Sequence, residues 1–520
     1  VTEGRINLTF RCKTKETDGE EEHERRDQWL EQMIDGAAPD SQGWSAASHS
    51  ETGNVTNAAT TTAFNDHSVF GHGVKQGDIP TDQKIQFLAK TNMGAECYCA
   101  AEIQEILATI VMESDTGGST KLDDWHVVAQ PLGMDGYVAC CCPTDHGENH
   151  DSIHKVKTTL LQNLRSAHHL LQYHTRLDIQ DMVTEEFPEP KLVDGETLYQ
   201  YVKKRLVDGT IVIQSLVNLK EKGGTFRTTC ERVGGPHAFR GPDVEFEAGG
   251  AMSEFYTWCK PKMEDYDVNV RVDVIANVVV IGTQLNVSDL SKDRHFMKFR
   301  NVVTIKANLA YAIVRCAGIQ PGMSIADPFC GSGTLLLEAL EVYKGQLKCI
   351  GLDVSRKTIQ GAAENAVAEG YNSEVCHFIC SDARGLRRHL GDESLDAIVS
   401  NLPWGIKTGH NGSISDLQTI YEIFLRTAWY SLKDGARVVL FVLRGLQLTR
   451  IVRKLGGRYR LLSVNVIRTT NNLPCLVVIE KLAVDQVRES VKGQLAHFNK
   501  YVSVSSELYE AIHMETINDD

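Results

Sequence analysis

The chain has 520 residues, of which 42% are hydrophobic and 23% are charged, and its formal net charge is −14 at pH 7. This composition is that of a soluble globular protein long enough for several domains, and the longest apolar runs, such as 438–443, are far too short to span a bilayer. The acidic balance argues against indiscriminate nucleic-acid binding, so such binding would need a local basic segment. No signal-peptide pattern is visible near the N-terminus, and we expect a cytoplasmic protein, with the nucleus as the alternative.

The fourteen cysteines are interpreted as reduced core residues of an intracellular protein, because many of them lie inside apolar runs. Cys97, Cys99 and the run 140–142 form the only cluster that could suggest a metal. Successive side chains of a strand point to opposite faces, so three consecutive cysteines cannot all reach one ion. The two spaced CxxC pairs of a zinc ribbon are absent from the sequence. We therefore expect no metal site.

The first 78 residues are mostly polar, with few side chains that could bury a core, so we predict that 1–78 is mostly a disordered extension. Region 79–180 is regular. Its predicted strands lie at 84–91, 125–131, 137–142 and 168–177, and its helices run from the turn at 93–96 to about 111 and over 153–164. This β-α-β-β-α-β order is typical of a ferredoxin-like unit.

Region 181–290 follows a Pro-Glu-Pro linker and is predicted to form a second small α+β unit. Its predicted helices lie at 195–207, 210–219 and 244–259, and its strands at 225–231, 268–275 and 278–285.

Region 291–320 is a basic linker that continues into a helix with apolar residues at helical spacing near 309–314. The linker contains one acid, Asp293, and five basic residues: Lys292, Arg294, Lys298, Arg300 and Lys306. Such a segment could lie along a phosphate backbone. A solvated linker is the alternative.

Region 321–482 alternates strands and helices, which predicts a doubly wound, mostly parallel sheet. The strands are expected at 323–326, 348–352, 375–380, 395–400, 437–443, 460–468 and 473–479, and the helices at 335–342, 355–369, 414–432 and 446–455. A short Thr-Thr-Asn-Asn turn joins the last two strands, so they should form an antiparallel hairpin at one edge. Residues 483–520 are a C-terminal tail with an amphipathic helix at about 487–498.

Two loops in this last region carry the chemistry. Residues 327–334, Asp-Pro-Phe-Cys-Gly-Ser-Gly-Thr, follow a strand and open a helix, which is the geometry of a nucleotide-type ligand site. Asp353 ends the next strand, 26 residues further on, where an acid binds ribose hydroxyls of a nucleoside ligand. Capping of the following helix is an alternative role for Asp353.

The second loop is Asn401-Leu402-Pro403-Trp404, again at the end of an apolar run. An exocyclic base amine is a poor nucleophile, because its lone pair is delocalised into the ring. The side-chain oxygen of Asn401 and the carbonyl of Leu402 can accept from both of its N–H groups and orient the nitrogen. Pro403 restricts the loop, and Trp404 offers a face for stacking a base, an interaction of roughly 1–3 kcal/mol.

The two loops together resemble those of S-adenosylmethionine-dependent amino-group methyltransferases with the seven-stranded, Rossmann-like class I fold. The Asn-Leu-Pro-Trp-Gly form differs from the Asn-Pro-Pro-Tyr form of DNA adenine and protein glutamine methyltransferases. It is similar to that of the THUMP domain-containing tRNA (guanine-N2-)-methyltransferase family. The segments FRTTCER, GGAMSEFY and VNVRVDVIANVVVIG of region 181–290 resemble a THUMP domain, an RNA-binding module that usually follows a ferredoxin-like unit.

The resemblance implies an α/β enzyme with S-adenosyl-L-methionine as cofactor and Asn401, Leu402, Pro403 and Trp404 as catalytic residues. Cofactor-binding residues would be Asp327, Phe329, Cys330, Gly331, Ser332, Gly333, Thr334, Asp353, Val354, Asp382, Ala383 and Asn401. RNA-binding residues would be Arg294, Lys298, Arg300, Lys306 and Lys407.

The function expected from this resemblance is formation of N2-methylguanosine in tRNA, near the acceptor stem. A small zinc-containing activator subunit that adds a strand to the catalytic sheet is an expected partner, and no membrane partner is expected. A guanosine of small nuclear RNA is the nearest alternative substrate. A non-catalytic RNA-binding scaffold and a DNA or protein amino-methyltransferase are alternatives from other classes.

Overall fold

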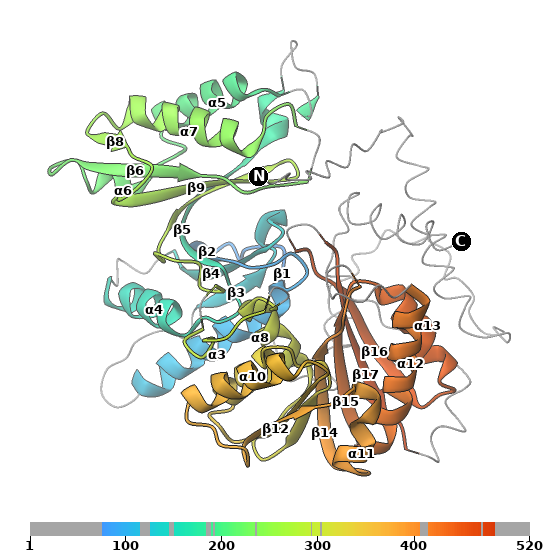
Figure 1. The fold of residues 1–520 in the computed structure, drawn as a ribbon. Helices are drawn as coiled ribbons and strands as arrows, with labels where there is room; N and C mark the ends of the chain where they lie inside the picture. Colours follow the sequence, from blue (N-terminus) through green and yellow to red (C-terminus); the bar gives the residue numbers. More distant parts are fainter. Residues whose placement is uncertain are drawn as a thin grey trace, which may run out of the picture.

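The computed structural model describes residues 75–114, 125–144, 150–183, 189–190, 193–234, 237–292, 294–301, 304–405, 414–469 and 472–483. Most of the predicted N-terminal extension and the predicted tail helix lie outside these residues. Two β-sheets organise the described chain (Figure 1). No helix among the described residues has the length and apolar character needed to cross a membrane.

The N-terminal unit, residues 75–183, has the β-α-β-β-α-β order that the sequence predicts. Its elements are β1 (Lys75–Gln76), β2 (Gln83–Lys90), α3 (Glu96–Ser114), β3 (His126–Ala129), β4 (Tyr137–Pro143), α4 (His150–Asn163), β5 (His169–Asp178) and the 3-10 helices Pro131–Gly133 and Ile179–Met182. The strand order β3-β4-β2-β5 is that of a ferredoxin-like sheet. Neighbouring Cys140 and Cys141 of β4 pack into separate hydrophobic clusters, as expected for successive strand residues.

The middle unit, residues 193–284, places α5 and α7 on one face of its strands (Figure 1). It consists of α5 (Gly195–Val207), α6 (Gln214–Val217), β6 (Gly224–Thr229), β7 (Arg232–Val233), α7 (Gly241–Phe255), β8 (Cys259–Pro261), β9 (Val268–Ile275) and β10 (Val278–Gln284). The predicted helix 210–219 is only the short α6, and strands β7 and β8 were not predicted from the sequence.

The two units share one sheet, which the sequence did not predict. Strand β10 pairs antiparallel with β5 over seven residue pairs, from Val278 opposite Asp178 to Gln284 opposite Leu171. The sheet therefore runs β1-β3-β4-β2-β5-β10-β9-β6-β8, with β7 paired to β9. Since the backbone hydrogen bonds of β5 and β10 cross the boundary, the N-terminal and middle units are continuous.

The C-terminal unit, residues 304–483, contains the predicted seven-stranded sheet. It comprises α8 (Ala307–Cys316), β11 (Ser324–Asp327), α9 (Thr334–Val342), β12 (Lys348–Asp353), α10 (Arg356–Ala368), β13 (Cys376–Cys380), a 3-10 helix (Ala383–Gly385), α11 (Leu386–Leu390), β14 (Leu395–Asn401), α12 (Ile414–Ser431), β15 (Leu432–Val442), α13 (Gly445–Lys454), β16 (Tyr459–Val466) and β17 (Cys475–Lys481). The order is β13-β12-β11-β14-β15-β17-β16. Strands β11 to β15 are parallel, and β17 is antiparallel to β15 and β16, which confirms the predicted hairpin.

Helices cover both faces of this sheet because successive strand side chains point in opposite directions. Val399 joins a cluster with α8, α9 and α10 on one face, whereas its neighbour Ile398 packs with α11, α12 and α13 on the other. Such a doubly wound sheet leaves the carboxyl ends of its parallel strands free for a ligand site.

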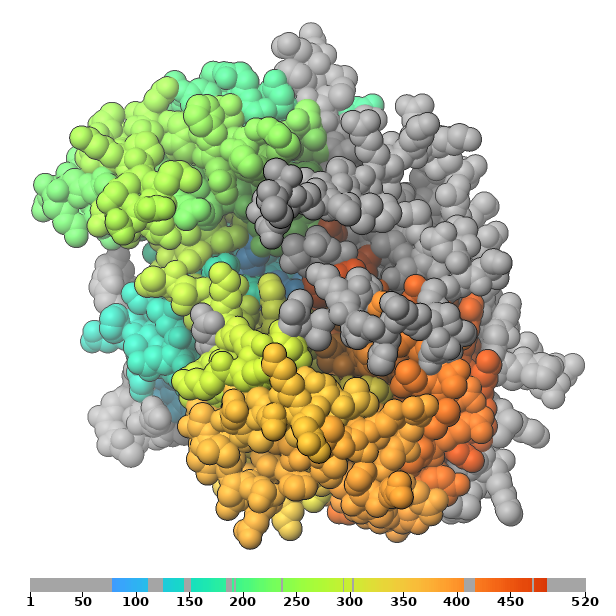
Figure 2. Space-filling model, viewed as in Figure 1, coloured from blue at the N-terminus to red at the C-terminus, as the bar shows by residue number. Residues whose placement is uncertain are grey.

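The N-terminal unit packs against the C-terminal unit through apolar and charged contacts. Tyr98 of α3 belongs to the same hydrophobic cluster as α8 and α9. Glu338 of α9 is completely buried and accepts from Arg165 Nε at 2.8 Å and from Arg294 Nε at 3.1 Å. In the space-filling view, the middle unit and the C-terminal unit lie at opposite ends, with the N-terminal unit between them (Figure 2).

Candidate active site

A cavity of about 690 Å³ opens where strands β11, β12 and β14 end. It is lined by all four residues predicted to be catalytic and by every predicted cofactor residue except Gly333. The structure therefore brings together two loops and two further strand ends that are separated by up to 77 residues in the sequence. This is the position in which a doubly wound sheet binds its ligand.

The loop after β11 turns sharply through two glycines. Gly331 has φ 51° and Gly333 has φ 79°, a region that residues with a Cβ rarely adopt. Gly333 caps α9, and its N–H donates to the carbonyl of Cys330 at 2.8 Å. A Cβ there would lie 3.0 Å from the ring of Phe378. Gly333 thus shapes the turn and is not among the lining residues of the cavity, and its role as a cofactor contact stays a prediction.

The carboxyl group of Asp327 is buried at the end of β11, with 1% of the residue exposed. It accepts from Ser400 Oγ at 2.6 Å and from Phe329 N at 3.0 Å. Loss of solvent raises the pKa of Asp327 to about 7, and the nearby charge of Asp353 adds to this. A cationic ligand group beside this carboxyl would restore its charged form.

Asp353 and Asp382 lie at the ends of the next two strands. Asp353 accepts from the amides of Gly331 at 3.2 Å and Ser355 at 2.8 Å. Ser355 is the residue that caps α10, since its side chain accepts from Thr358 N, so the alternative capping role considered for Asp353 is wrong. Asp382 is held by both Nε and Nη2 of Arg384, at 2.9 and 2.8 Å, and this bonding lowers its pKa.

The loop after β14 carries two buried polar atoms without partners. Asn401 Oδ1 and Trp404 Nε1 form no hydrogen bond with any described residue. The loop itself is well held, because Leu402 N donates to the carbonyl of Phe441 at 3.0 Å and Tyr421 OH donates to the carbonyl of Pro403. Buried polar atoms are nearly always satisfied in native proteins, so these two indicate a ligand that supplies a donor and an acceptor.

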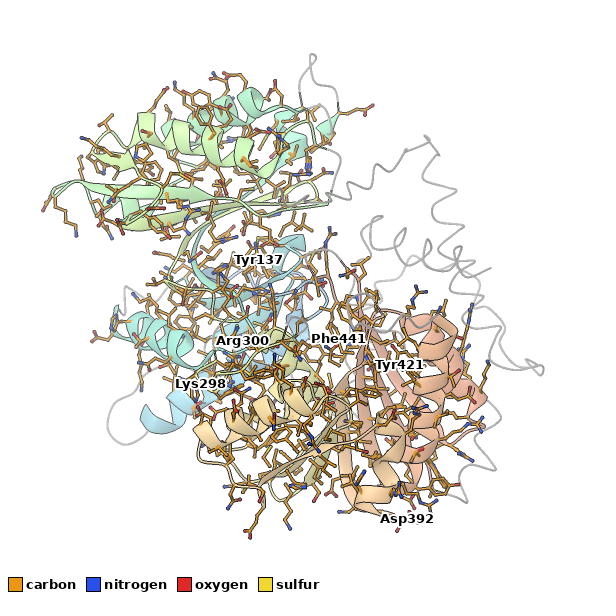
Figure 3. All side chains as sticks on the ribbon, viewed as in Figure 1. Tyr137, Lys298, Arg300, Asp392, Tyr421 and Phe441 are labelled. Carbon is orange, nitrogen blue, oxygen red and sulfur yellow. The ribbon has the colours of Figure 1, made fainter. Side chains whose placement is uncertain are left out.

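Aromatic side chains support this loop from behind. The ring of Trp404 lies 5.8 Å from that of Phe441, at an angle of 56°. Figure 3 shows Phe441 and Tyr421 at the end of the C-terminal sheet that faces the N-terminal unit. Neither was predicted as a site residue, because the sequence pattern of an aromatic residue in an apolar strand or helix predicts a residue of the hydrophobic core.

Three further lining residues could not be predicted from the local sequence. Asn92 comes from the β2–α3 loop of the N-terminal unit, and Thr469 and Asn472 come from the β16–β17 hairpin. Asn92 Nδ2 donates to the carbonyl of Arg468 at 2.7 Å, which ties these two segments together. The only sequence signal was the polar turn at 469–472, which was interpreted as a hairpin.

The predicted RNA-binding residues divide into three groups. Lys306 lines the cavity, and Lys298 and Arg300 are exposed (Figure 3). Arg294 is not available to a phosphate, because its side chain is 9% exposed and bonds Glu338 and the carbonyls of Leu290 and Arg165. The prediction for Arg294 is therefore wrong. Lys407 lies outside the described residues.

One group of side chains among the described residues has the spacing of metal ligands: His295, Glu341 and Glu369. His295 Nε2 lies 2.8 Å from Glu369 Oε2, which is within the distance of an ion pair. His295 is 61% exposed, and the group lies outside the cavity lining. The lining of the cavity supplies carboxylate, amide and aromatic side chains.

The residues of the cavity fit S-adenosylmethionine. The glycine-containing turn permits close approach of a ligand to the backbone, the buried Asp327 suits an ammonium group, and Asp353 stands at the strand end that binds ribose. Together with the strand order and the terminal hairpin, they define a class I S-adenosylmethionine-dependent methyltransferase.

Comparison with known proteins identifies the family. Residues 294–467 match the family of RMKL-like methyltransferase domains. The tRNA (guanine(6)-N2)-methyltransferase of Thermus thermophilus is 34% identical over 262 residues, which are 50% of this chain and 74% of that protein. The tRNA (guanine(6)-N(2))-methyltransferase THUMP3 of Bos taurus is 34% identical over 194 residues, 35% of this chain and 37% of that protein. The chain belongs to the tRNA (guanine-N2)-methyltransferase family.

A solved structure supports the same assignment over a larger part of the chain. The crystal structure of TrmN from Thermus thermophilus is similar with a TM-score of 0.52 and 27% sequence identity. The match covers 77% of this chain and 100% of that chain. It therefore extends beyond the C-terminal unit into the units that precede it.

Proposed function

We propose that this enzyme transfers a methyl group to N2 of a guanosine in tRNA, at position 6. The observation that carries this proposal is the orphaned Oδ1 of Asn401, a buried acceptor at the cavity beside the loop that begins at Asp327. The names of the Thermus and bovine relatives support guanine, tRNA and position 6. A relative from Methanocaldococcus jannaschii, 29% identical, is a tRNA (guanine(10)-N2)-dimethyltransferase, so position 10 is the second candidate.

In the proposed reaction, bound S-adenosylmethionine supplies an electrophilic methyl group. Asn401 Oδ1 and the Leu402 carbonyl accept from the two N–H groups of the guanine amine and orient its nitrogen. Trp404 stacks on the extruded base, and Pro403 is held by Tyr421, so the acceptors are in place before the substrate arrives. The amine loses its proton after methyl transfer, which requires no strong base on the protein.

The cofactor would be held by groups from three strand ends. Asp327 would accept from the ammonium group, and the turn at Gly331 would approach the methionine part. Asp353 would accept from the ribose hydroxyls, with the exposed Val354 beside the adenine. Asp382 and the backbone of Ala383 would bind the adenine amine. Arg384 would then lose one of its two hydrogen bonds to Asp382.

For the RNA, we propose that Lys306 binds a phosphate at the cavity and that Lys298, Arg300 and Lys407 bind the backbone further out. A guanosine of small nuclear RNA uses the same chemistry and is the alternative substrate. We also propose that the enzyme works in the cytoplasm. The thirteen cysteines in the described part of the chain form no disulfide, which fits a reducing compartment.

We further propose that a small zinc-containing activator subunit pairs with β13. This strand is the outer member of the seven-stranded sheet, and its residues His377 and Cys380 are exposed. An outer strand presents backbone donors and acceptors that another chain can bind. Co-purification of the two proteins, and its loss on placing a proline at His377, would support this arrangement.

The test of the function is methyl transfer from labelled S-adenosylmethionine to tRNA, with and without the activator, followed by nucleoside analysis. One unmodified transcript carries guanosine at position 6 but not at position 10, and a second carries it at position 10 but not at position 6, so the two positions can be told apart. Small nuclear RNA tests the alternative substrate. N2-methylguanosine from the position-6 transcript is the expected result. Methylation of the other RNA alone would overturn the tRNA assignment.

A further inference from the structure

Besides the linker at 292–306, the C-terminal unit contains a second basic segment. Residues 435–479 contain no Asp or Glu, in a chain that has 68 acidic residues. The same segment contains eight basic residues: Arg437, Arg444, Arg450, Arg453, Lys454, Arg458, Arg460 and Arg468. A cluster of this kind in an acidic protein is a candidate for an anionic partner.

Helix α13 concentrates part of this charge on one face. Its buried side, with Leu448, Ile451 and Val452, packs into the cluster that includes α12, β16 and β17. The opposite side presents Arg450 and Lys454, which are exposed, and Arg453, which is half-buried. These three positions are spaced three and four residues apart and therefore share one side of the helix. We call them the α13 basic face.

Arg450 and Lys454 of the α13 basic face differ from other exposed arginines of the C-terminal unit. Four of those are paired with carboxylates: Arg384 with Asp382, Arg387 with Asp392, Arg426 with Glu422 and Arg460 with Glu480. Within the described part of the chain, no carboxylate lies within 4.0 Å of Arg450 or Lys454. Burial lowers the pKa of Arg453, and the positive charge of Arg450 lowers it further, as expected for cations that face one another.

The helix starts next to the catalytic cavity. Phe441 lines the cavity and contacts Trp404, and Arg444, three residues later, is the N-cap of α13. Arg444 also lies close enough to Tyr421 for its charge to lower the pKa of that hydroxyl, although burial raises the pKa overall. At 1.5 Å per residue, Arg450 to Lys454 lie about 9 to 15 Å along the helix from Arg444.

We propose that the α13 basic face binds backbone phosphates of the RNA strand that carries the target nucleotide. This inference rests on the proposed function, because it is the position of the base in the cavity that brings the adjacent phosphates to α13. Guanidinium groups bind phosphate oxygens through paired hydrogen bonds, and Arg450 and Lys454 are one helical turn apart. A binding surface for an acidic protein would not need to lie next to the cavity that holds the base, whereas a binding surface for the RNA strand would. RNA is therefore favoured.

The test is the double charge reversal Arg450→Glu/Lys454→Glu in the full chain, with Arg450→Gln/Lys454→Gln as a milder second variant. The KM for tRNA should rise about tenfold at moderate salt, whereas kcat and cofactor affinity should stay within about twofold. The slope of log binding constant against log salt should fall by about 1.4 to 1.8, the value for two lost phosphate contacts.

The matched control is Lys344→Glu/Lys348→Glu, which changes the charge equally at the amino end of β12, away from the cavity. The control should leave KM and slope near those of the wild type. The proposal would be overturned if the α13 variant and the control variant had equal effects. It would also be overturned if the salt slope of the α13 variants were unchanged, and that result would favour a protein partner. If the wild type transfers no methyl group to tRNA, the proposed function fails, but the binding slopes still decide whether α13 contacts RNA.

Discussion

At the scale of single residues, two side chains at neighbouring strand ends differ in their hydrogen bonding. Asp327 ends β11 and accepts two hydrogen bonds at Oδ1 but is desolvated, whereas Asn401 ends β14 and has a buried acceptor without a donor. Both conditions cost stability in the free protein. A ligand that places a cationic group beside Asp327 and an N–H group beside Asn401 would remove both costs. The chemistry of the ligand can therefore be inferred from the desolvated carboxyl group and the unpaired acceptor.

For Asp327, we predict a pH-dependent destabilisation. Its pKa is raised to about 7, whereas an aspartate of the unfolded chain titrates near 4. Between these values the folded state holds the proton more tightly, so the contribution of Asp327 to the free energy of unfolding falls as the pH rises from about 4 to about 7. Asp327→Asn should therefore gain stability relative to the wild type between pH 5 and pH 8, by at most about 4 kcal/mol.

Urea denaturation of both proteins at several pH values measures this difference. Asp392→Asn is the control, because Arg387 lowers the pKa of Asp392 and its replacement should bring no such gain. A difference between Asp327→Asn and the wild type that does not change with pH would refute the prediction.

For Asn401, replacement by alanine should reduce methyl transfer by about 1,000-fold, since the acceptor that orients the amine is removed. Cofactor affinity should change by less than about threefold. Thermal stability should be maintained, because the variant lacks the unsatisfied oxygen. Steady-state kinetics, calorimetric cofactor titration and thermal melts measure the three quantities. Asn401→Asp keeps an acceptor oxygen and should retain part of the activity, and full activity of the alanine variant would exclude the role of Asn401.

At the scale of elements, the β16–β17 hairpin forms part of the cavity wall and is bonded there by the N-terminal unit as well as by β15. Asn92 Nδ2 donates to the carbonyl of Arg468, and Arg468 N donates to the carbonyl of Met93 at 2.9 Å. Asn465 of β16 also bonds the hydroxyl of Tyr98. A Cβ on Gly94 would lie 2.0 Å from the Val466 carbonyl, so the two backbones are in close contact.

Asn92 is predicted to couple the N-terminal unit to catalysis. Its Oδ1 accepts from Asn308 Nδ2 at 2.7 Å and lies 3.0 Å from His168 Nε2. Asn92→Ala would remove an acceptor of Asn308 Nδ2 and the bond to the hairpin, so we expect a loss of about 1–3 kcal/mol in stability. We also expect about a tenfold fall in kcat/KM for RNA, with cofactor affinity unchanged.

Denaturation and steady-state kinetics check the prediction for Asn92. Asn163→Ala is the control, since Asn163 is exposed on α4 and bonds only the carbonyl of Thr159 in its own helix. If both variants behave alike, the hairpin does not depend on Asn92.

At the scale of the whole molecule, the three units are joined by one sheet and one buried charge cluster. The pairing of β5 with β10 makes the N-terminal and middle units a single body. Glu338 then connects that body to the C-terminal unit, because it binds Arg165 from the N-terminal unit and Arg294 from the linker. The first two units are thereby held in a fixed arrangement with the C-terminal unit.

Removal of Glu338 should be strongly destabilising, because the buried guanidinium group of Arg294 would lose its carboxylate partner and Arg165 would keep only the more distant carboxylate of Glu341. For Glu338→Ala we expect a loss of about 3–5 kcal/mol, measured by urea denaturation. Glu341→Ala is the comparison one turn away. Its side chain is 22% exposed and lies 3.9 Å from Arg165, so its loss should be below about 1 kcal/mol. Equal effects of the two variants would mean that the cluster does not hold the units together.

By itself, the sequence determined the features that depend on local pattern. The strands and helices of 321–482, the loop at 327–334 and the acids at strand ends were predicted because parallel strands alternate with helices and because turns need glycine. Asn401 and Trp404 were predicted from one contiguous motif. All these residues meet at the cavity because the carboxyl ends of parallel strands lie at one edge.

Only the tertiary structure decided the features that depend on contacts between distant segments. The basic character of Arg294 is visible in the sequence, but its pairing with Glu338, 44 residues later, is not. Asn92 reaches the cavity across 376 residues through its bond to Arg468. The joining of β5 to β10 and the basic face of α13 are also products of packing. A local pattern specifies which residues form an element, whereas burial and pairing depend on what folds against that element.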